Sequence, residues 1–216
     1  MVEKDYFCNV KPYRLMRFAF LIFLLLPVAG QAYVCFRTWL LLPAIPALRI
    51  AVVALMVVAF VLFFIAMSGT IDHWPMPLAT ATYKIGTSWL MILLYLFLAF
   101  LLLDILRLCH VLPMSVVRGN AWTSAALTIF MTALFVYAYF HFDDKKRVEL
   151  TLTTDKPLDS GLTLVLVSDL HLGYHNTRAD LHRWLQLLKA ENPDAILIGG
   201  DIIDGSYRPV AETAMA

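Results

Sequence analysis

The chain of 216 residues is far more apolar than an ordinary soluble protein. Hydrophobic residues make up 61% and charged residues 15% of it, whereas soluble domains average about 45–50% and about 25%. This balance excludes a wholly soluble enzyme. The net charge of +1, without any strongly basic stretch, gives no sign of nucleic-acid binding. Cys8, Cys35 and Cys109 indicate neither a disulfide framework nor a zinc cluster.

Four apolar runs are long enough to cross a hydrocarbon core, which requires roughly 20 residues. We expect them at about 18–36, 50–68, 88–103 and 121–142. The basic residues before the first run and the small residues at its end would also fit a cleaved signal peptide. Because three further runs follow, we favour a retained helix. The sequence therefore predicts a four-helix transmembrane domain at 1–142.

The basic residues that flank these runs predict the orientation, because cytoplasmic loops carry an excess of Lys and Arg. Four lie on the side opposite the N-terminus, namely Arg37, Arg49, Arg107 and Arg118. Eight lie on the side of the N-terminus, namely Lys4, Lys11, Arg14, Arg17, Lys84, Lys145, Lys146 and Arg147. We therefore expect a multi-pass protein of the cell membrane whose soluble part is cytoplasmic.

Two polar features interrupt the membrane half. Asp104 and Arg107 are spaced so that they could pair on one helix face, and a small transporter that uses them is one hypothesis. Their place near the end of the third run favours an interfacial role instead. The loop GTIDHWPMP at 69–77 contains an Asp and a His, but its Trp is typical of a membrane anchor. We interpret both features as structural.

The pattern changes to that of a soluble α/β unit after the fourth run. Residues 143–161 form a predicted linker, in which VELTLT at 148–153 alternates as an edge strand does. The apolar runs at 162–168 and 195–200 predict strands buried on both faces. Between them, 177–191 has helical periodicity, with Thr177 and Asp180 forming a capping box. We therefore expect the two strands to be parallel and joined by a right-handed crossover through the helix.

Acidic and imidazole side chains come directly after both strands. Asp169 and His171 alternate with leucines in SDLHLG, so in an extended segment they would share one face. Asp201 follows the second strand in GGDIIDG, where Gly200 allows a tight turn. Because ligands bind at the carboxyl ends of parallel strands, we expect the three side chains to meet there. Two carboxylates and an imidazole suit manganese, iron or zinc.

These residues resemble the first two signatures of the calcineurin-like metallophosphoesterases, Asp-x-His and Gly-Asp-x-x-Asp. Residues 162–210 look especially similar to a membrane-associated bacterial branch. The resemblance implies an α/β sandwich with two divalent metal ions that hydrolyses phosphoric esters or pyrophosphates. Asp169 and His171 would ligate the first metal ion, and Asp201 would bridge both. Asp204 would hold the loop or a ligand by hydrogen bonds, and His175 would reach a substrate phosphate.

The later signatures of that family, Gly-Asn-His-Asp/Glu and Gly-His-x-His, do not occur in these 216 residues. We therefore expect 162–216 to be the truncated first β-α-β unit of the domain, with no or very weak hydrolysis. The partners implied are the lipid bilayer and a phosphoester substrate, of which a lipid-linked one is an option. The alternative is a structural or partner-binding membrane protein that carries a non-catalytic phosphoesterase remnant.

Overall fold

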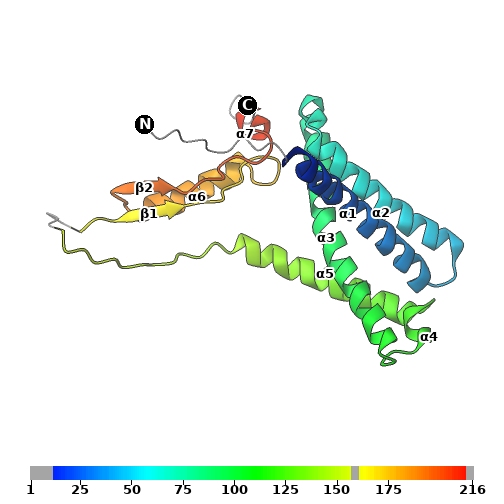
Figure 1. Cartoon of the computed structure of the whole chain (residues 1–216). Coiled ribbons are helices and arrows are strands. Elements are labelled where there is room, and N and C mark those ends of the chain that lie inside the picture. The colour runs from blue at the N-terminus through cyan, green and yellow to red at the C-terminus, as the bar shows by residue number, and fades with distance from the viewer. Residues whose placement is uncertain (1–11, 157–160, 213–216) are drawn as a thin grey trace, which may run out of the picture. The chain divides into compact units, whose positions relative to one another are not determined.

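The computed structural model describes residues 12–156 and 161–212, with the side chains of α1 described from residue 25 onward. The helical part consists of α1 (Pro12–Leu41), α2 (Pro46–Met67), the 3₁₀ turn η1 (Thr70–His73), α3 (Met76–Leu108), α4 (Met114–Val117) and α5 (Ala121–Asp143) (Figure 1). The later part consists of β1 (Leu164–Val167), α6 (Arg178–Ala190), β2 (Ala195–Ile198) and α7 (Arg208–Glu212). The chain divides into two compact units.

Three of the described helices, α2, α3 and α5, are long and apolar enough to cross a membrane. The sequence predicts four spans, so the number is corrected to three for the described residues. The remaining predicted span falls within α1, and the described side chains cover only the C-terminal half of that helix. This half is too short to count as a span and includes the buried polar side chains of Gln31 and Arg37.

The first unit comprises the chain up to Met56 together with Ile92–Thr128. The spacing allows Asp104 to pair with Arg107, but Asp104 forms an ion pair with Arg37 of α1 at 2.8 Å. The hydroxyl of Tyr33 also donates to Asp104, at 2.6 Å. Arg37 is buried, and a buried charge needs such a partner. Asp104 therefore connects α3 to α1 and gives no support to a transport role with Arg107.

The second unit comprises Val57–Met91 together with the residues from Ile129 onward. The end of α2, η1 and the start of α3 form a helical hairpin. Gly86 of α3 faces the backbone of α2 so closely that an added Cβ would lie 2.6 Å from the Phe63 nitrogen. Small residues permit this kind of close helix packing. The backbones of α2 and α3 are therefore in close contact at Gly86.

Helix α3 is longer than a hydrocarbon core requires. Its 33 residues correspond to about 50 Å at 1.5 Å per residue, against a hydrocarbon thickness of about 30 Å. The predicted span at 88–103 would leave residues 76–87, at the N-terminal end of α3, beyond the hydrocarbon.

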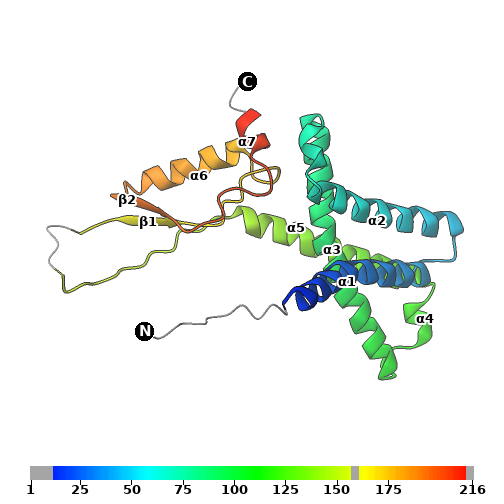
Figure 2. The same ribbon diagram turned by 45° about the horizontal axis from the view of Figure 1, so that its top comes forward.

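The strand–helix–strand prediction is confirmed in outline, because β1 and β2 form a two-stranded parallel sheet that pairs Leu164 with Ala195 and Val167 with Ile198. Helix α6 lies along one side of the pair (Figure 2). The Asp180 carboxylate accepts a hydrogen bond from the Thr177 backbone nitrogen at 2.8 Å, and the Thr177 side chain accepts one from the Asp180 backbone, as the predicted capping box requires.

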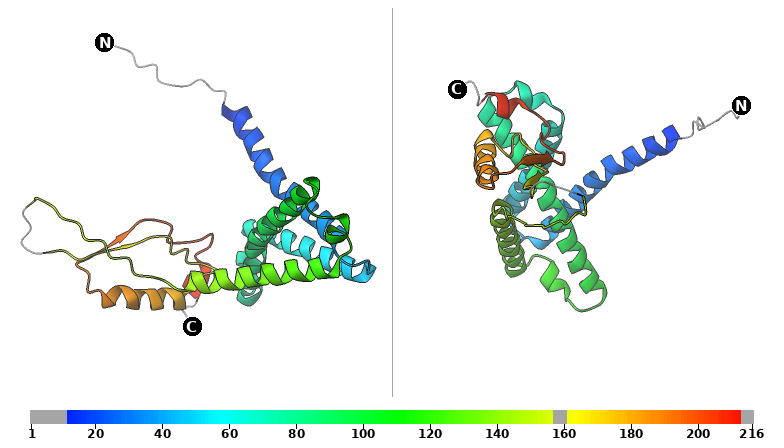
Figure 3. Two further views of the ribbon diagram at one scale, coloured as in Figure 1. Left: turned by 90° about the horizontal axis from the view of Figure 1, so that it is seen from below. Right: turned by 90° about the vertical axis from the view of Figure 1, so that its left-hand side faces the viewer.

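Two predictions about the strands are wrong. Residues 148–153 form no strand, and Val148 and Leu152 are 89% and 81% exposed. Figure 3 shows the described segment between α5 and β1 as coil, and the sheet found in the described residues consists of β1 and β2. The strands β1 and β2 are also not buried on both faces, since Leu166 and Ile198 are 70% and 58% exposed. The physical reason is that the sheet consists of only these two strands, and the single helix α6 can cover only one of its faces.

Candidate metal site at the strand ends

The loops that follow β1 and β2 lie side by side because the strands are parallel and in register. Backbone hydrogen bonds continue beyond the strands, from Asp169 nitrogen to Gly200 oxygen at 3.2 Å and from His171 nitrogen to Asp201 oxygen at 2.9 Å. A third bond joins the Leu172 nitrogen to the Ile202 oxygen at 2.8 Å. The pairing carries the predicted ligands of both loops to the same edge of the sheet.

The backbone at these residues is left-handed rather than extended, which corrects the geometry expected for SDLHLG. The φ angles are 57° at Asp169, 43° at His171 and 48° at Asp201. Non-glycine residues in this region store about 1–3 kcal/mol each, and such strain gathers at functional sites. The leucines nevertheless face the interior as predicted, since Leu172 is 5% exposed and packs with Trp184.

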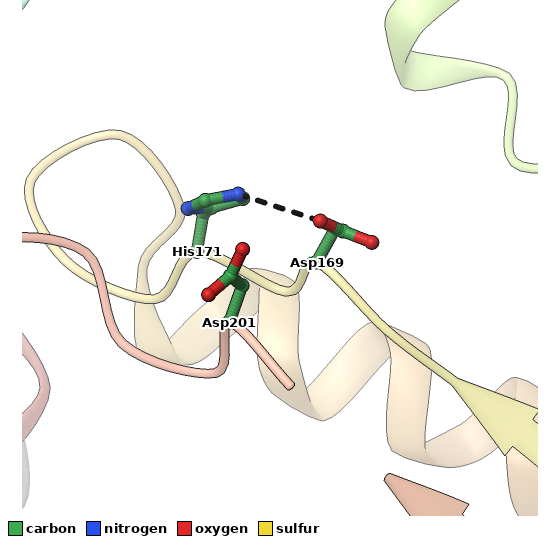
Figure 4. A group of neighbouring side chains, drawn as sticks. All are labelled: Asp169, His171 and Asp201. Atoms are coloured by element: carbon green, nitrogen blue, oxygen red, sulfur yellow. Dashed lines mark ion pairs between the residues drawn. The ribbon is translucent and has the colours of Figure 1, made fainter. Parts of the chain in front are cut away.

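The side chains of Asp169, His171 and Asp201 converge at this edge, with one potential ligand atom from each within 4.8 Å of the others. Figure 4 shows them turned toward a common space, with His171 Nε2 3.9 Å from Asp169 Oδ1. All three side chains are exposed. The sequence prediction that they meet is therefore confirmed in its geometry.

The donor set fits a divalent ion. Ligand atoms lie about 2.0–2.2 Å from a transition metal, so any two are at most about 4.4 Å apart. The ligand atoms of the group lie within 4.8 Å of one another, and exposed side chains can reach coordination distance by small rotations. Carboxylates with one imidazole suit manganese, iron or zinc. Metal binding itself stays a prediction.

Asp204 ties the two loops together and reaches the hairpin. Its backbone nitrogen donates to the Leu172 oxygen at 2.9 Å, and its carboxylate accepts a hydrogen bond from the Tyr83 hydroxyl of α3 at 2.9 Å. Gly173 leaves the necessary space, because an added Cβ would lie 2.6 Å from the Asp204 carbonyl oxygen. Asp204 thus has the contacts of a loop-holding residue, while its role toward a metal ion stays a prediction.

His175 faces the start of α3. Its Nε2 lies 2.8 Å from the Thr87 hydroxyl, which itself donates to the Tyr83 carbonyl at 2.6 Å. A hydroxyl has one proton, so His175 Nε2 is the donor in this pair. Partial burial against the hairpin and the nearby ammonium of Lys84 lower the pKa of His175. The predicted contact of His175 with a substrate phosphate is untested.

The loop at 69–77, for which a membrane anchor is predicted, also contacts the α/β unit. Tyr174 is fully buried, and its hydroxyl donates to the Asp72 carboxylate at 2.6 Å. Burial and this hydrogen bond raise the pKa of Tyr174 to about 12. Arg208 Nη1 donates to the carbonyl oxygens of Asp72 and Trp74. Sequence reasoning missed these residues because no local pattern relates positions about a hundred residues apart.

The α/β unit thus carries Asp-x-His after β1 and Gly-Asp-x-x-Asp after β2, at the same edge of a parallel pair of strands. Residues 162–215 match the family described as calcineurin-like phosphoesterase. The C-terminal part of the chain is therefore a fragment of such a domain, preceded by apolar helices long enough to cross a membrane.

A transmembrane protein with metallophosphoesterase domain from Danio rerio is 31% identical over 102 residues. The matched region covers 45% of this chain and 23% of that protein, so the chain spans about a quarter of the relative's length. Since 102 residues do not fit after position 162, the similarity extends into the preceding part of the chain. This relative is from a fish, so the comparisons do not support the predicted bacterial branch. No solved structure matches the chain.

Proposed function

We propose that this chain carries the first part of a membrane-anchored, metal-dependent phosphoesterase, in which Asp169, His171 and Asp201 hold divalent metal ions. The observation that carries the proposal is the convergence of their ligand atoms within 4.8 Å at the ends of two parallel strands. The match of residues 162–215 to the calcineurin-like phosphoesterases supports it.

The chemistry assigned to this site is hydrolysis of a phosphoric ester or a pyrophosphate. A divalent ion, when bound, supplies Lewis-acid polarisation of a phosphoryl oxygen and lowers the pKa of a water molecule. The residues of this chain contribute ligand atoms from two adjacent loops, and Asp201 has two oxygens with which to serve two ions. Tethering to a bilayer favours a membrane-proximal substrate, because it raises the effective concentration of the site there. The cytoplasmic side predicted from the flanking basic residues was counted for four spans, and it stays a prediction because three spans are found among the described residues.

Mn²⁺ binding by the full 216-residue chain in lipid nanodiscs tests the proposal. We expect saturable binding that Asp201→Asn weakens at least about tenfold. Asp155→Asn, which removes an exposed carboxylate outside the group, is the matched control and should leave binding unchanged. Equal binding by the wild type and Asp201→Asn would reject the site. We expect hydrolysis of an aryl phosphate diester by these 216 residues to be weak or absent, since they contain only two of the family's signatures.

The alternative function, a partner-binding membrane protein with a non-catalytic remnant, is favoured by the exposed apolar side chains of β1 and β2. Leu166 and Ile198 are 70% and 58% exposed, and apolar patches of this kind mark contact surfaces. Under this alternative, Mn²⁺ would not bind specifically and Asp201→Asn would change no property of the protein.

A further inference from the structure

The hairpin made by α2, η1 and α3 contacts both loops that carry the candidate ligands, and it does so at equivalent positions. Tyr174 lies three residues after His171, and Asp204 lies three residues after Asp201. Tyr174 donates its hydroxyl to Asp72 of η1 at 2.6 Å. Asp204 accepts the hydroxyl of Tyr83 of α3 at 2.9 Å. Each loop is therefore held by one tyrosine–aspartate hydrogen bond.

The two bonds belong to one packed interface. Tyr83 and Tyr174 are 5% and 0% exposed and share a cluster with Ile71. Their ring centroids are 5.1 Å apart. Next to Tyr83, Gly205 has a φ of 60°, and an added Cβ would lie 3.5 Å from the Tyr83 hydroxyl oxygen. The tyrosine rings thus fix the distance between hairpin and loops, while their hydroxyls fix the register.

A cationic residue completes the interface from the other side of the second loop. Arg208 Nη1 donates to the carbonyl oxygens of Asp72 and Trp74. Carbonyls at the end of a short 3₁₀ turn lack partners within the turn, so the guanidinium satisfies them. Tyr174 of the first loop and Arg208, which follows the second loop, are in this way both attached to Asp72 of η1.

From this arrangement we infer that the membrane hairpin is a working part of the metal site, with Tyr83 as a positioning residue that acts through Asp204. The inference rests on the proposed metal site and deepens it. Tyr83 does not belong to the ligand group, yet it holds the loop that presents Asp201. The strained left-handed backbone at Asp169, His171 and Asp201 requires such support from the surrounding structure. Metal affinity therefore depends on the membrane part of the chain.

The test uses the full chain in nanodiscs and two measurements, Mn²⁺ affinity by electron paramagnetic resonance and hydrogen–deuterium exchange of 169–176 and 201–206. Tyr83→Phe keeps the ring and removes the hydroxyl. We expect it to weaken Mn²⁺ affinity about tenfold, as loss of an outer hydrogen bond typically does, and to speed exchange in both loops. Tyr137→Phe makes the same chemical change at a 66% exposed position of α5 and should alter neither measurement.

Variants of Asp204 separate positioning from general stability. Asp204→Asn keeps an acceptor oxygen for Tyr83 and should stay near the wild-type affinity, whereas Asp204→Ala should reproduce the effect of Tyr83→Phe. In a double-mutant cycle, the effect of Tyr83→Phe should vanish in the Asp204→Ala background. The melting temperature of the protein should change little in Tyr83→Phe and in Asp204→Asn.

The inference is overturned if Tyr83→Phe matches the wild type in affinity and exchange, or if its full effect persists with Asp204→Ala. A failure of the proposed function gives a different result: the wild type binds no Mn²⁺, or Asp201→Asn binds Mn²⁺ as tightly as the wild type. In that case, exchange in the two loops alone decides whether the hairpin positions them.

Discussion

The close approach of α2 and α3 at Gly86 leads to a prediction opposite in sign to the one from helix propensity. Replacing glycine by alanine inside a helix normally stabilises it by about 0.5–1 kcal/mol. At Gly86, however, the new Cβ would lie 2.6 Å from the Phe63 nitrogen and 2.7 Å from the Leu62 carbonyl carbon. Both are backbone atoms, so no side-chain rotation relieves the clash.

The magnitude follows from the displacement required. An ordinary contact begins near 3.4 Å, so α2 must move away by most of an ångström along much of its contact with α3. Overpacking of this kind costs about 1–3 kcal/mol, which exceeds the propensity gain. Gly86→Ala should therefore lower the free energy of unfolding by about 1–2 kcal/mol.

Gly30 of α1 is the matched control, because a Cβ added there meets nothing within 4 Å. Both variants are made in the full chain and unfolded by titration with sodium dodecyl sulfate in mixed micelles, with helicity followed by circular dichroism. Gly30→Ala should be neutral or stabilising, and Gly86→Ala destabilising. If Gly86→Ala is as stable as Gly30→Ala, the hairpin is not packed at backbone contact and the reasoning is refuted.

Three further predictions concern single contacts. Asp104→Asn should destabilise the protein by about 2 kcal/mol in the same titration because it leaves the buried Arg37 without its counter-charge. Arg107→Gln should have little effect. If Arg107→Gln destabilised the protein more than Asp104→Asn, the ion pair of Asp104 with Arg37 would be contradicted. Because the pKa of Tyr174 is raised to about 12 from its ordinary 10.0, its contribution to stability is fully present below pH 10 and is lost as the pH rises through about 12. The difference in absorbance at 295 nm between the wild type and Tyr174→Phe should therefore titrate near pH 12, and a midpoint near 10 would contradict the buried contact. Asp180→Ala should destabilise α6 by about 1 kcal/mol by removing the capping box, and unchanged exchange of the first-turn amides would argue against it.

Much of the fold was predictable because its determinants are local. The apolar runs predict α2, α3 and α5, and the change from continuous apolar residues to a helical period predicts β1, α6 and β2. The meeting of Asp169, His171 and Asp201 was predictable although Asp201 is distant in sequence, because parallel pairing brings strand ends together. The left-handed backbone at these residues was not, since it depends on hydrogen bonds between the two loops.

What could not be predicted are contacts between residues that no periodicity connects. Tyr83 and Asp204 are separated by 121 positions, and Asp72 and Tyr174 by 102. The sequence therefore makes Asp72 look like part of an anchor loop and makes Asp104 look like a partner of its neighbour Arg107. Asp104 instead pairs with the distant Arg37, because the packing of helices decides which charges are buried together.

The most direct test of the metal site is electron–nuclear double resonance of Mn²⁺ bound to the full chain, which detects nitrogen atoms that coordinate the ion. The proposal predicts coupling to one histidine nitrogen that disappears in His171→Gln and is retained in His175→Gln. Bound Mn²⁺ without nitrogen coupling, or with coupling that His171→Gln leaves intact, would contradict the claim that Asp169, His171 and Asp201 gather around one ion.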